Sequence, residues 1–136
     1  MFNKQRDSTM HPFRAYIALH TDISEEDWQI IMPYLKHRIF QQNRVILKPG
    51  AICNELYFLE NGKVSFYTEM TSEKEIFQSI GPPQIFTSAN SFINRIPSNV
   101  GFLAAEESYV WIMPRQNVYE LMDLPCWSNF IAAFSS

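Results

Sequence analysis

The chain has 136 residues, of which 46% are hydrophobic and 15% aromatic, a length and composition that suit one domain with its own core and exclude intrinsic disorder. The formal net charge of −3 gives no basic footprint for nucleic acid, and two cysteines are too few for a disulfide scaffold or an iron–sulfur cluster. No apolar run approaches the roughly 20 residues of a membrane span, and the charged start lacks the apolar stretch of a signal peptide, so we expect a cytoplasmic domain without membrane contact.

The N-terminal third predicts a polar tail followed by helices. Residues 1–12 are polar and aperiodic, and residues 13–20 suit a short helix. Ser24, followed by three acidic residues, is typical of a helix N-cap, where the helix dipole favours negative charge. Apolar residues then recur at the spacing of one helical face, at Trp28, Ile31, Met32 and Leu35. Pro33 lies inside this pattern and predicts a kink or an early end.

Short strands are predicted from residue 37 to residue 113. We expect strands at 37–40, 44–47, 56–59, 64–67, 75–80, 100–104 and 109–113. Asn61-Gly62 is a strong hairpin signal, because both central residues of such a turn need positive φ. Seven strands at this spacing, with helices before and after them, predict a mainly β fold. The expected architecture is a double-stranded β-helix, that is a jelly roll or β-roll, with flanking N- and C-terminal α-helices.

The C-terminal segment, residues 114–136, predicts two helices. Pro114 is expected to begin the first one, because a proline at the first helical position loses no hydrogen bond. After an interruption at 123–125, a second apolar face follows at Trp127, Phe130, Ile131 and Phe134. This face is too apolar for a solvated helix. It either packs on the barrel of the same chain or begins a two-fold dimer helix, and we favour the homodimer.

Catalytic and metal-binding patterns are weak in this sequence. The three histidines, His11, His20 and His37, are far apart and lack metal-ligand spacing. Cys126 lies near a helix start without a neighbouring histidine or resolving cysteine, which favours an apolar role. We therefore predict no enzyme activity, no metal and no cofactor. A metal-dependent jelly-roll enzyme is the least favoured alternative.

One segment, Gly81 to Ser98, differs from ordinary hairpin chemistry. It places a short helix, residues 89–93, between two strands, with the hydroxyl residues Thr87 and Ser88 at its start. The free N–H groups of a helix N-terminus can bind anions. A connecting loop in which Phe92 fills the barrel explains the same residues equally well.

The order of these elements resembles the cyclic nucleotide-binding domain, and within it the sensory half of Crp/Fnr-type bacterial transcription regulators. The resemblance covers residues 23–134. It is carried by the capped helix and by four stretches of sequence: Phe40, Val45-Ile46 with Gly50, Leu56–Val64, and Ile80–Phe86. It implies a single domain over 1–136, with a tail at 1–12, helices at 13–36, a β-roll at 37–113, and helices at 114–136.

The resemblance also implies a phosphate-binding cassette at 81–99. In the family, a Gly-Glu pair begins the cassette, and the glutamate accepts a hydrogen bond from the ribose. An arginine ten residues after the glutamate pairs with the cyclic phosphate. In this chain the Gly-Glu positions are occupied by Thr87-Ser88 and the arginine position by Ser98. Both charged anchors are therefore replaced. The candidate pocket residues are Phe86, Thr87, Ser88, Ala89, Ser98 and Asn99.

These observations predict an effector-sensing regulatory domain of a Crp/Fnr-like transcription regulator, with an atypical, uncharged pocket for a small-molecule effector. The alternative is a genuine sensor of cyclic AMP or cyclic GMP. Regulators of this family continue into a long dimer helix and a helix-turn-helix, so DNA is expected as a partner only through a domain absent from this chain. The chain is either a piece of a longer regulator or a free-standing sensor.

Overall fold

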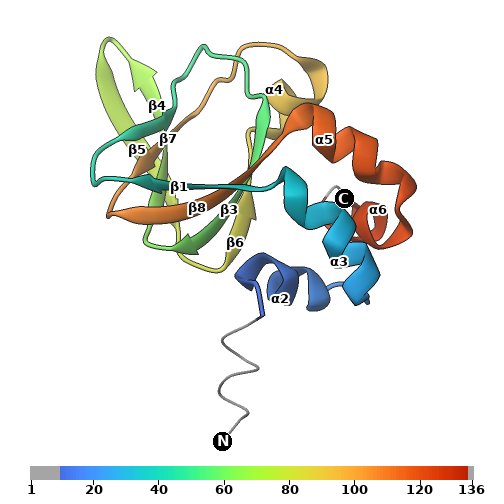
Figure 1. Cartoon of the computed structure of the whole chain (residues 1–136). Coiled ribbons are helices and arrows are strands. Elements are labelled where there is room, and N and C mark those ends of the chain that lie inside the picture. Colours follow the sequence, from blue (N-terminus) through green and yellow to red (C-terminus); the bar gives the residue numbers. More distant parts are fainter. Residues whose placement is uncertain (1–9, 135–136) are drawn as a thin grey trace, which may run out of the picture. The chain divides into compact units, whose positions relative to one another are not determined.

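The computed structural model describes residues 10–134, which contain eight strands and seven short helical segments (Figure 1). The strands are β1 (Lys36–Phe40), β2 (Val45–Leu47), β3 (Glu55–Asn61), β4 (Val64–Met70), β5 (Glu73–Ile80), β6 (Gln84–Phe86), β7 (Gly101–Ala104) and β8 (Ser108–Pro114). The helical segments are α2 (Pro12–Ala18), α3 (Glu25–Ile31), η1 (Met32–Tyr34), α4 (Ala89–Asn94), α5 (Arg115–Glu120), η2 (Leu121–Asp123) and α6 (Pro125–Ala132). The predicted mainly β fold with helices before and after a β-roll is confirmed.

The chain divides into two compact units. The roll unit comprises Lys36–Arg115, and the helical unit comprises the residues up to Leu35 together with those from Gln116 onwards. No helix among residues 10–134 is long and apolar enough to cross a membrane.

The roll unit is built from two antiparallel four-stranded sheets, one in the order β1-β8-β3-β6 and the other in the order β2-β7-β4-β5 (Figure 1). Aromatic rings from the two sheets meet inside the roll. Tyr57 and Phe86 of the first sheet contact Phe102 of the second, with ring centroids 5.9 and 5.2 Å away. All three side chains are buried. Burial of these rings removes apolar surface from water and stabilises the contact between the two sheets.

The predicted Asn61-Gly62 hairpin is wrong. β3 pairs with β6 and β8, whereas β4 pairs with β5 and β7, so this turn connects one sheet to the other. Of the two residues only Gly62 has positive φ (104°), and a Cβ there would overlap the Ser108 hydroxyl and the Glu107 carbonyl. The pattern correctly indicates a chain reversal but does not contain the identity of the paired strand.

A two-residue hairpin does occur between β4 and β5. Its central residues, Thr71 and Ser72, both have positive φ, at 54° and 73°. Pairing runs from Met70 opposite Glu73 to Val64 opposite Ile80. The sequence predicts strands on both sides of this turn but does not indicate its type, because neither residue is the Asn or Gly that usually occupies such positions.

Two smaller differences concern the ends of strands. β6 was not predicted, because its three residues lie between Pro83 and the cassette helix, yet it pairs with β3 along Tyr57–Leu59. Pro114 does not begin a helix. It ends β8 opposite Glu55, and α5 begins one residue later at Arg115.

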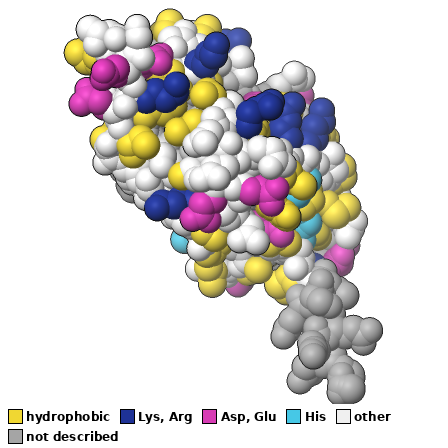
Figure 2. Space-filling view, turned by 90° about the vertical axis from the view of Figure 1, so that its left-hand side faces the viewer, with side chains coloured by type: hydrophobic (Ala, Val, Ile, Leu, Met, Phe, Trp, Pro, Cys, Tyr) yellow, Lys and Arg dark blue, Asp and Glu magenta, His cyan; other side chains and the backbone are white. Residues whose placement is uncertain are grey.

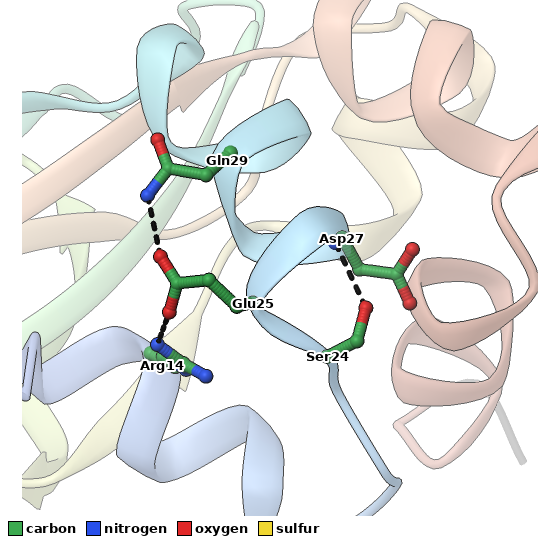
Figure 3. A network of polar contacts seen from close by, with 5 residues as sticks. All are labelled: Arg14, Ser24, Glu25, Asp27 and Gln29. Atoms are coloured by element: carbon green, nitrogen blue, oxygen red, sulfur yellow. Dashed lines mark hydrogen bonds and ion pairs between the residues drawn. The ribbon is translucent and has the colours of Figure 1, made fainter.

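The predicted N-cap at Ser24 is confirmed, since its hydroxyl accepts a hydrogen bond from the Asp27 N–H at 3.0 Å. The next residue, Glu25, accepts from Arg14 of α2 at 2.6 Å and from Gln29 at 2.7 Å (Figure 3). These contacts connect α2 with the first turn of α3. α3 ends at Ile31 and continues as the 3-10 turn η1, as expected for a helix that ends early near a proline.

Candidate functional site

The cassette segment, residues 81–99, contains β6, α4 and the chain that leads to β7. α4 is confirmed where the sequence predicts a short helix. Ser88 is its N-cap residue, and the Ser88 carbonyl accepts from the Phe92 N–H at 2.8 Å. Arg95 ends the helix in the left-handed conformation, with φ of 56°, and its N–H donates to the Ser91 carbonyl. The helix therefore begins and ends within the cassette.

Two of the candidate residues, Ser88 and Ser98, meet in the folded chain. Their hydroxyl oxygens are 2.7 Å apart, and the residues are 8% and 3% exposed. The Ser98 hydroxyl donates to the Val100 carbonyl at 2.7 Å. Because a serine hydroxyl has one hydrogen, the Ser88 hydroxyl is the donor in the pair. The Ser88 hydroxyl makes no capping bond to α4 and is directed to Ser98 instead.

The backbone of Ser98 pairs with the segment that follows β2. The Gly50 N–H donates to the Ser98 carbonyl at 2.6 Å, and the Ser98 N–H donates to the Ala51 carbonyl at 2.8 Å. Ile52 and Pro97 form an isolated bridge beside them. Gly50 has φ of 93°, a conformation that favours glycine. The end of the cassette is thus held by main-chain bonds as well as by the serine pair.

Ser91, which is not among the candidates predicted from the sequence, is 1% exposed. Its hydroxyl accepts from the Cys53 N–H at 2.8 Å and donates to the Ile96 carbonyl. Thr87 was a candidate, and its hydroxyl donates to the Glu55 carbonyl at 2.8 Å and lies 3.2 Å from the Cys53 sulfur.

The other candidate residues divide into buried and exposed ones. Ala89 and Asn99 are exposed, whereas Phe86 is buried and stacks on Tyr57 with ring centroids 5.0 Å apart. Burial raises the pKa of Tyr57 well above its usual range, and the neighbouring Glu55 carboxylate adds to this rise. Tyr57 is therefore a neutral donor at physiological pH, and it donates to that carboxylate at 3.1 Å.

Phe92 of α4 is buried, and its carbonyl accepts from Arg115 Nε at 2.6 Å. The Arg115 guanidinium also lies over the Phe92 ring, 5.9 Å from the centroid. A cation at the last carbonyls of a helix is favoured by the helix dipole. Arg115 therefore holds the C-terminal end of α4. Among the described residues, no group of three or more His, Cys, Asp or Glu is placed to hold a metal ion.

The family model of the cyclic nucleotide-binding domain matches residues 37–124, which is more than half of the chain. The chain belongs to this family. No curated protein matches this cyclic nucleotide-binding domain by sequence. The match begins in β1 and extends through the whole roll unit, so it includes the cassette.

Solved structures of similar fold include bacterial regulators. The catabolite activator protein of Thermus thermophilus has a TM-score of 0.70 at 20% identity, over 82% of this chain and 53% of that protein. A cyclic nucleotide-binding domain from Methylobacillus flagellatus KT has a TM-score of 0.71 at 16% identity, over 87% and 72%. The N-terminal domain of a transcriptional regulator from Streptomyces coelicolor A3(2) has a TM-score of 0.66 at 13% identity, over 83% and 80%. This cyclic nucleotide-binding domain spans about half the length of the Thermus protein.

Three residues of the stripe expected on a dimer helix, Trp127, Phe130 and Ile131, lie on α6 in the helical unit, and Phe134 lies two residues beyond its end. Trp127 and Phe130 are fully buried there against Phe13 of α2, with ring centroids 6.2 and 5.7 Å away. The Trp127 indole N–H donates to the Val118 carbonyl. Ile131 is half-buried, and Phe134 is 41% exposed. The stripe is thus divided between core positions and surface positions of the helical unit.

Proposed function

We propose that this chain is the effector-sensing regulatory domain of a Crp/Fnr-like transcription regulator, and that its cassette does not bind cyclic nucleotides. The observation that carries the proposal is the pair of buried serine hydroxyls, Ser88 and Ser98, at the two positions where the family has a glutamate and an arginine. The pair is neutral, and its hydrogens are used within the chain.

The expected loss of affinity follows from the chemistry of the cyclic phosphate. A phosphate taken out of water needs a charged partner, because desolvation of an unpaired ion is costly. Removing one buried charged partner typically costs about 2–5 kcal/mol, a factor of about thirty to several thousand in the dissociation constant. With both anchors replaced, a domain of this fold should bind cyclic nucleotides too weakly to respond to them.

Calorimetric titration of the chain with cyclic AMP and cyclic GMP tests the proposal. We expect no binding at micromolar ligand concentrations. Micromolar binding of either nucleotide would contradict the proposal and support the alternative, a genuine cyclic nucleotide sensor.

A double replacement tests whether the missing charges are the cause. Ser88→Glu with Ser98→Arg restores both anchors and should confer measurable nucleotide binding. The matched control is Ser88→Gln with Ser98→Met, which adds side chains of similar size without charge and should leave the chain inert. If neither double variant binds, loss of charge does not explain the inert wild type. If both bind, the charges are irrelevant.

We further propose that DNA is contacted through a helix-turn-helix outside these 136 residues and that the active form is a homodimer. The net charge of −3 supports the first part. On the face drawn in Figure 2, basic side chains lie in small groups with acidic ones among them. A salt-sensitive gel shift by this chain alone would contradict that part. Sedimentation as a monomer well above micromolar concentration would contradict the dimer, for which the half-buried Ile131 and the exposed Phe134 are the candidates.

A further inference from the structure

The hydroxyl groups of the cassette are all engaged by the chain itself. Thr87, Ser88, Ser91 and Ser98 each form at least one hydrogen bond within the roll unit. Ser88, Ser91 and Ser98 are all less than a tenth exposed. A buried polar group without a partner is costly, whereas a paired one contributes about 1 kcal/mol. These four hydroxyls are therefore satisfied without any bound molecule.

Three of these residues bond to successive points of one segment, residues 50–55, which leads from β2 into β3. Ser98 pairs through its backbone with Gly50 and Ala51. The Ser91 hydroxyl accepts from the Cys53 N–H, and the Thr87 hydroxyl donates to the Glu55 carbonyl. The partners of Thr87, Ser91 and Ser98 follow one another in reverse order along the 50–55 segment. The two stretches therefore run antiparallel and are hydrogen-bonded at three points.

The fourth residue, Ser88, closes the cassette on itself. Its bond to Ser98 joins the residue before α4 to the residue that is paired with the 50–55 segment. Ser91 adds a second internal closure through its bond to the Ile96 carbonyl. Arg115 holds the far end of α4 through the Phe92 carbonyl. Both ends of the short helix are therefore fixed by contacts within the roll unit.

We infer that Thr87, Ser88, Ser91 and Ser98 form a latch that keeps the cassette closed on the 50–55 segment without an effector. This inference rests on the proposed function. In a domain that binds cyclic nucleotides, contacts with the nucleotide would order the cassette, and here we assign that role to the latch. The cassette then has one conformation whatever the concentration of cyclic nucleotide. A signal that changes this domain must act by breaking the latch or by binding elsewhere on its surface.

Amide hydrogen exchange of the whole chain tests the latch. In Ser91→Ala and in Ser88→Ala, the amides of residues 87–99 should exchange at least about fivefold faster than in the wild type, since each variant loses at least one buried hydrogen bond. In Ser91→Ala the Cys53 amide should also lose protection. Residues 64–80 should be unchanged in both variants.

The chain offers a matched control in a second serine pair. Ser65, 2% exposed, lies on β4 with its hydroxyl 2.9 Å from that of Ser79 on β5. Ser65→Ala should increase exchange only within 64–80 and leave the cassette protected. Ser88→Thr keeps a hydroxyl at the latch and should retain wild-type protection.

The latch is contradicted if Ser88→Ala leaves cassette exchange unchanged, or raises it no more than Ser65→Ala does. If Ser91→Ala fails to fold, Ser88→Ala decides alone, since it removes only the bond to Ser98. Calorimetry separates this inference from the proposed function. Nucleotide binding by the wild type contradicts the proposed function. The latch is contradicted instead when Ser88→Ala does not specifically increase amide exchange in the cassette.

Discussion

The aromatic interior of the roll unit allows a quantitative test through Phe102. This residue is 1% exposed, and its ring lies 5.0 Å from Phe66, 5.2 Å from Phe86 and 5.9 Å from Tyr57 between centroids. Replacing a core phenylalanine by alanine typically costs about 3–5 kcal/mol. Aromatic pairs contribute about 0.5–1.5 kcal/mol each beyond their buried area. Because Phe102 makes three such contacts, we expect Phe102→Ala to lower the free energy of unfolding by about 4–5 kcal/mol.

Urea unfolding followed by circular dichroism measures this loss. The control is Phe77→Ala on β5, where the same residue type is 57% exposed and should cost less than about 1 kcal/mol. A loss below about 2 kcal/mol for Phe102→Ala would show that these rings do not support one another.

Three further predictions concern the helical unit. Ser24→Ala should lower the free energy of unfolding by about 1 kcal/mol in urea titration, through loss of the N-cap, and Ser24→Asp should not. Hydrogen bonds from Gln29 and then Arg14 lower the pKa of Glu25 below 4.5, so its stabilising contribution is present above that pH and is lost as the pH falls through the lowered pKa. The drop in stability between about pH 5 and pH 3 should therefore be smaller in Glu25→Gln than in the wild type. Burial raises the pKa of the Cys126 thiol to about 11, so at pH 8 a disulfide reagent should label it rapidly only after unfolding in urea, and fast labelling of the folded chain would contradict this.

Local signals in the sequence located most of the elements. Capping at Ser24, the early end before Pro33 and the short helix after Ser88 all depend on neighbouring residues, and the structure confirms each. Strand pairing depends on distant residues instead. The Asn61-Gly62 turn has the local chemistry of a hairpin, but β3 and β4, the strands on either side of it, belong to opposite sheets, and no local pattern contains that information. β6 was missed for the same reason, since its pairing with β3 defines it.

In the candidate site, too, the sequence indicates some residues and gives no sign of contacts between distant parts of the chain. Ser88 and Ser98 were singled out together because the resemblance aligned them with the two charged anchors of the cassette, one for the ribose and one for the phosphate. The hydroxyls of the two serines are 2.7 Å apart. Ser91 makes as many contacts but aligns with no functional residue, so nothing marked it. Its partner, the Cys53 N–H, is 38 residues away in sequence. Bonds between a side chain and a distant backbone leave no pattern in the sequence, because the backbone group is the same in every residue.

The replacement of both anchors together follows from the cost of an unpaired buried charge. A glutamate at Ser88 without its arginine, or the reverse, would be a buried ion with no partner, which costs about 3–5 kcal/mol. Either charged side chain alone should therefore destabilise the folded chain more than the two together do. Ser88→Glu and Ser98→Arg should each destabilise the chain strongly, and the double variant should be more stable than the sum of the two losses predicts, by at least about 2 kcal/mol. Urea unfolding of the four proteins measures this coupling. Additive losses would show that the two side chains do not meet, and would remove the electrostatic reason for expecting the pair to be lost as a unit.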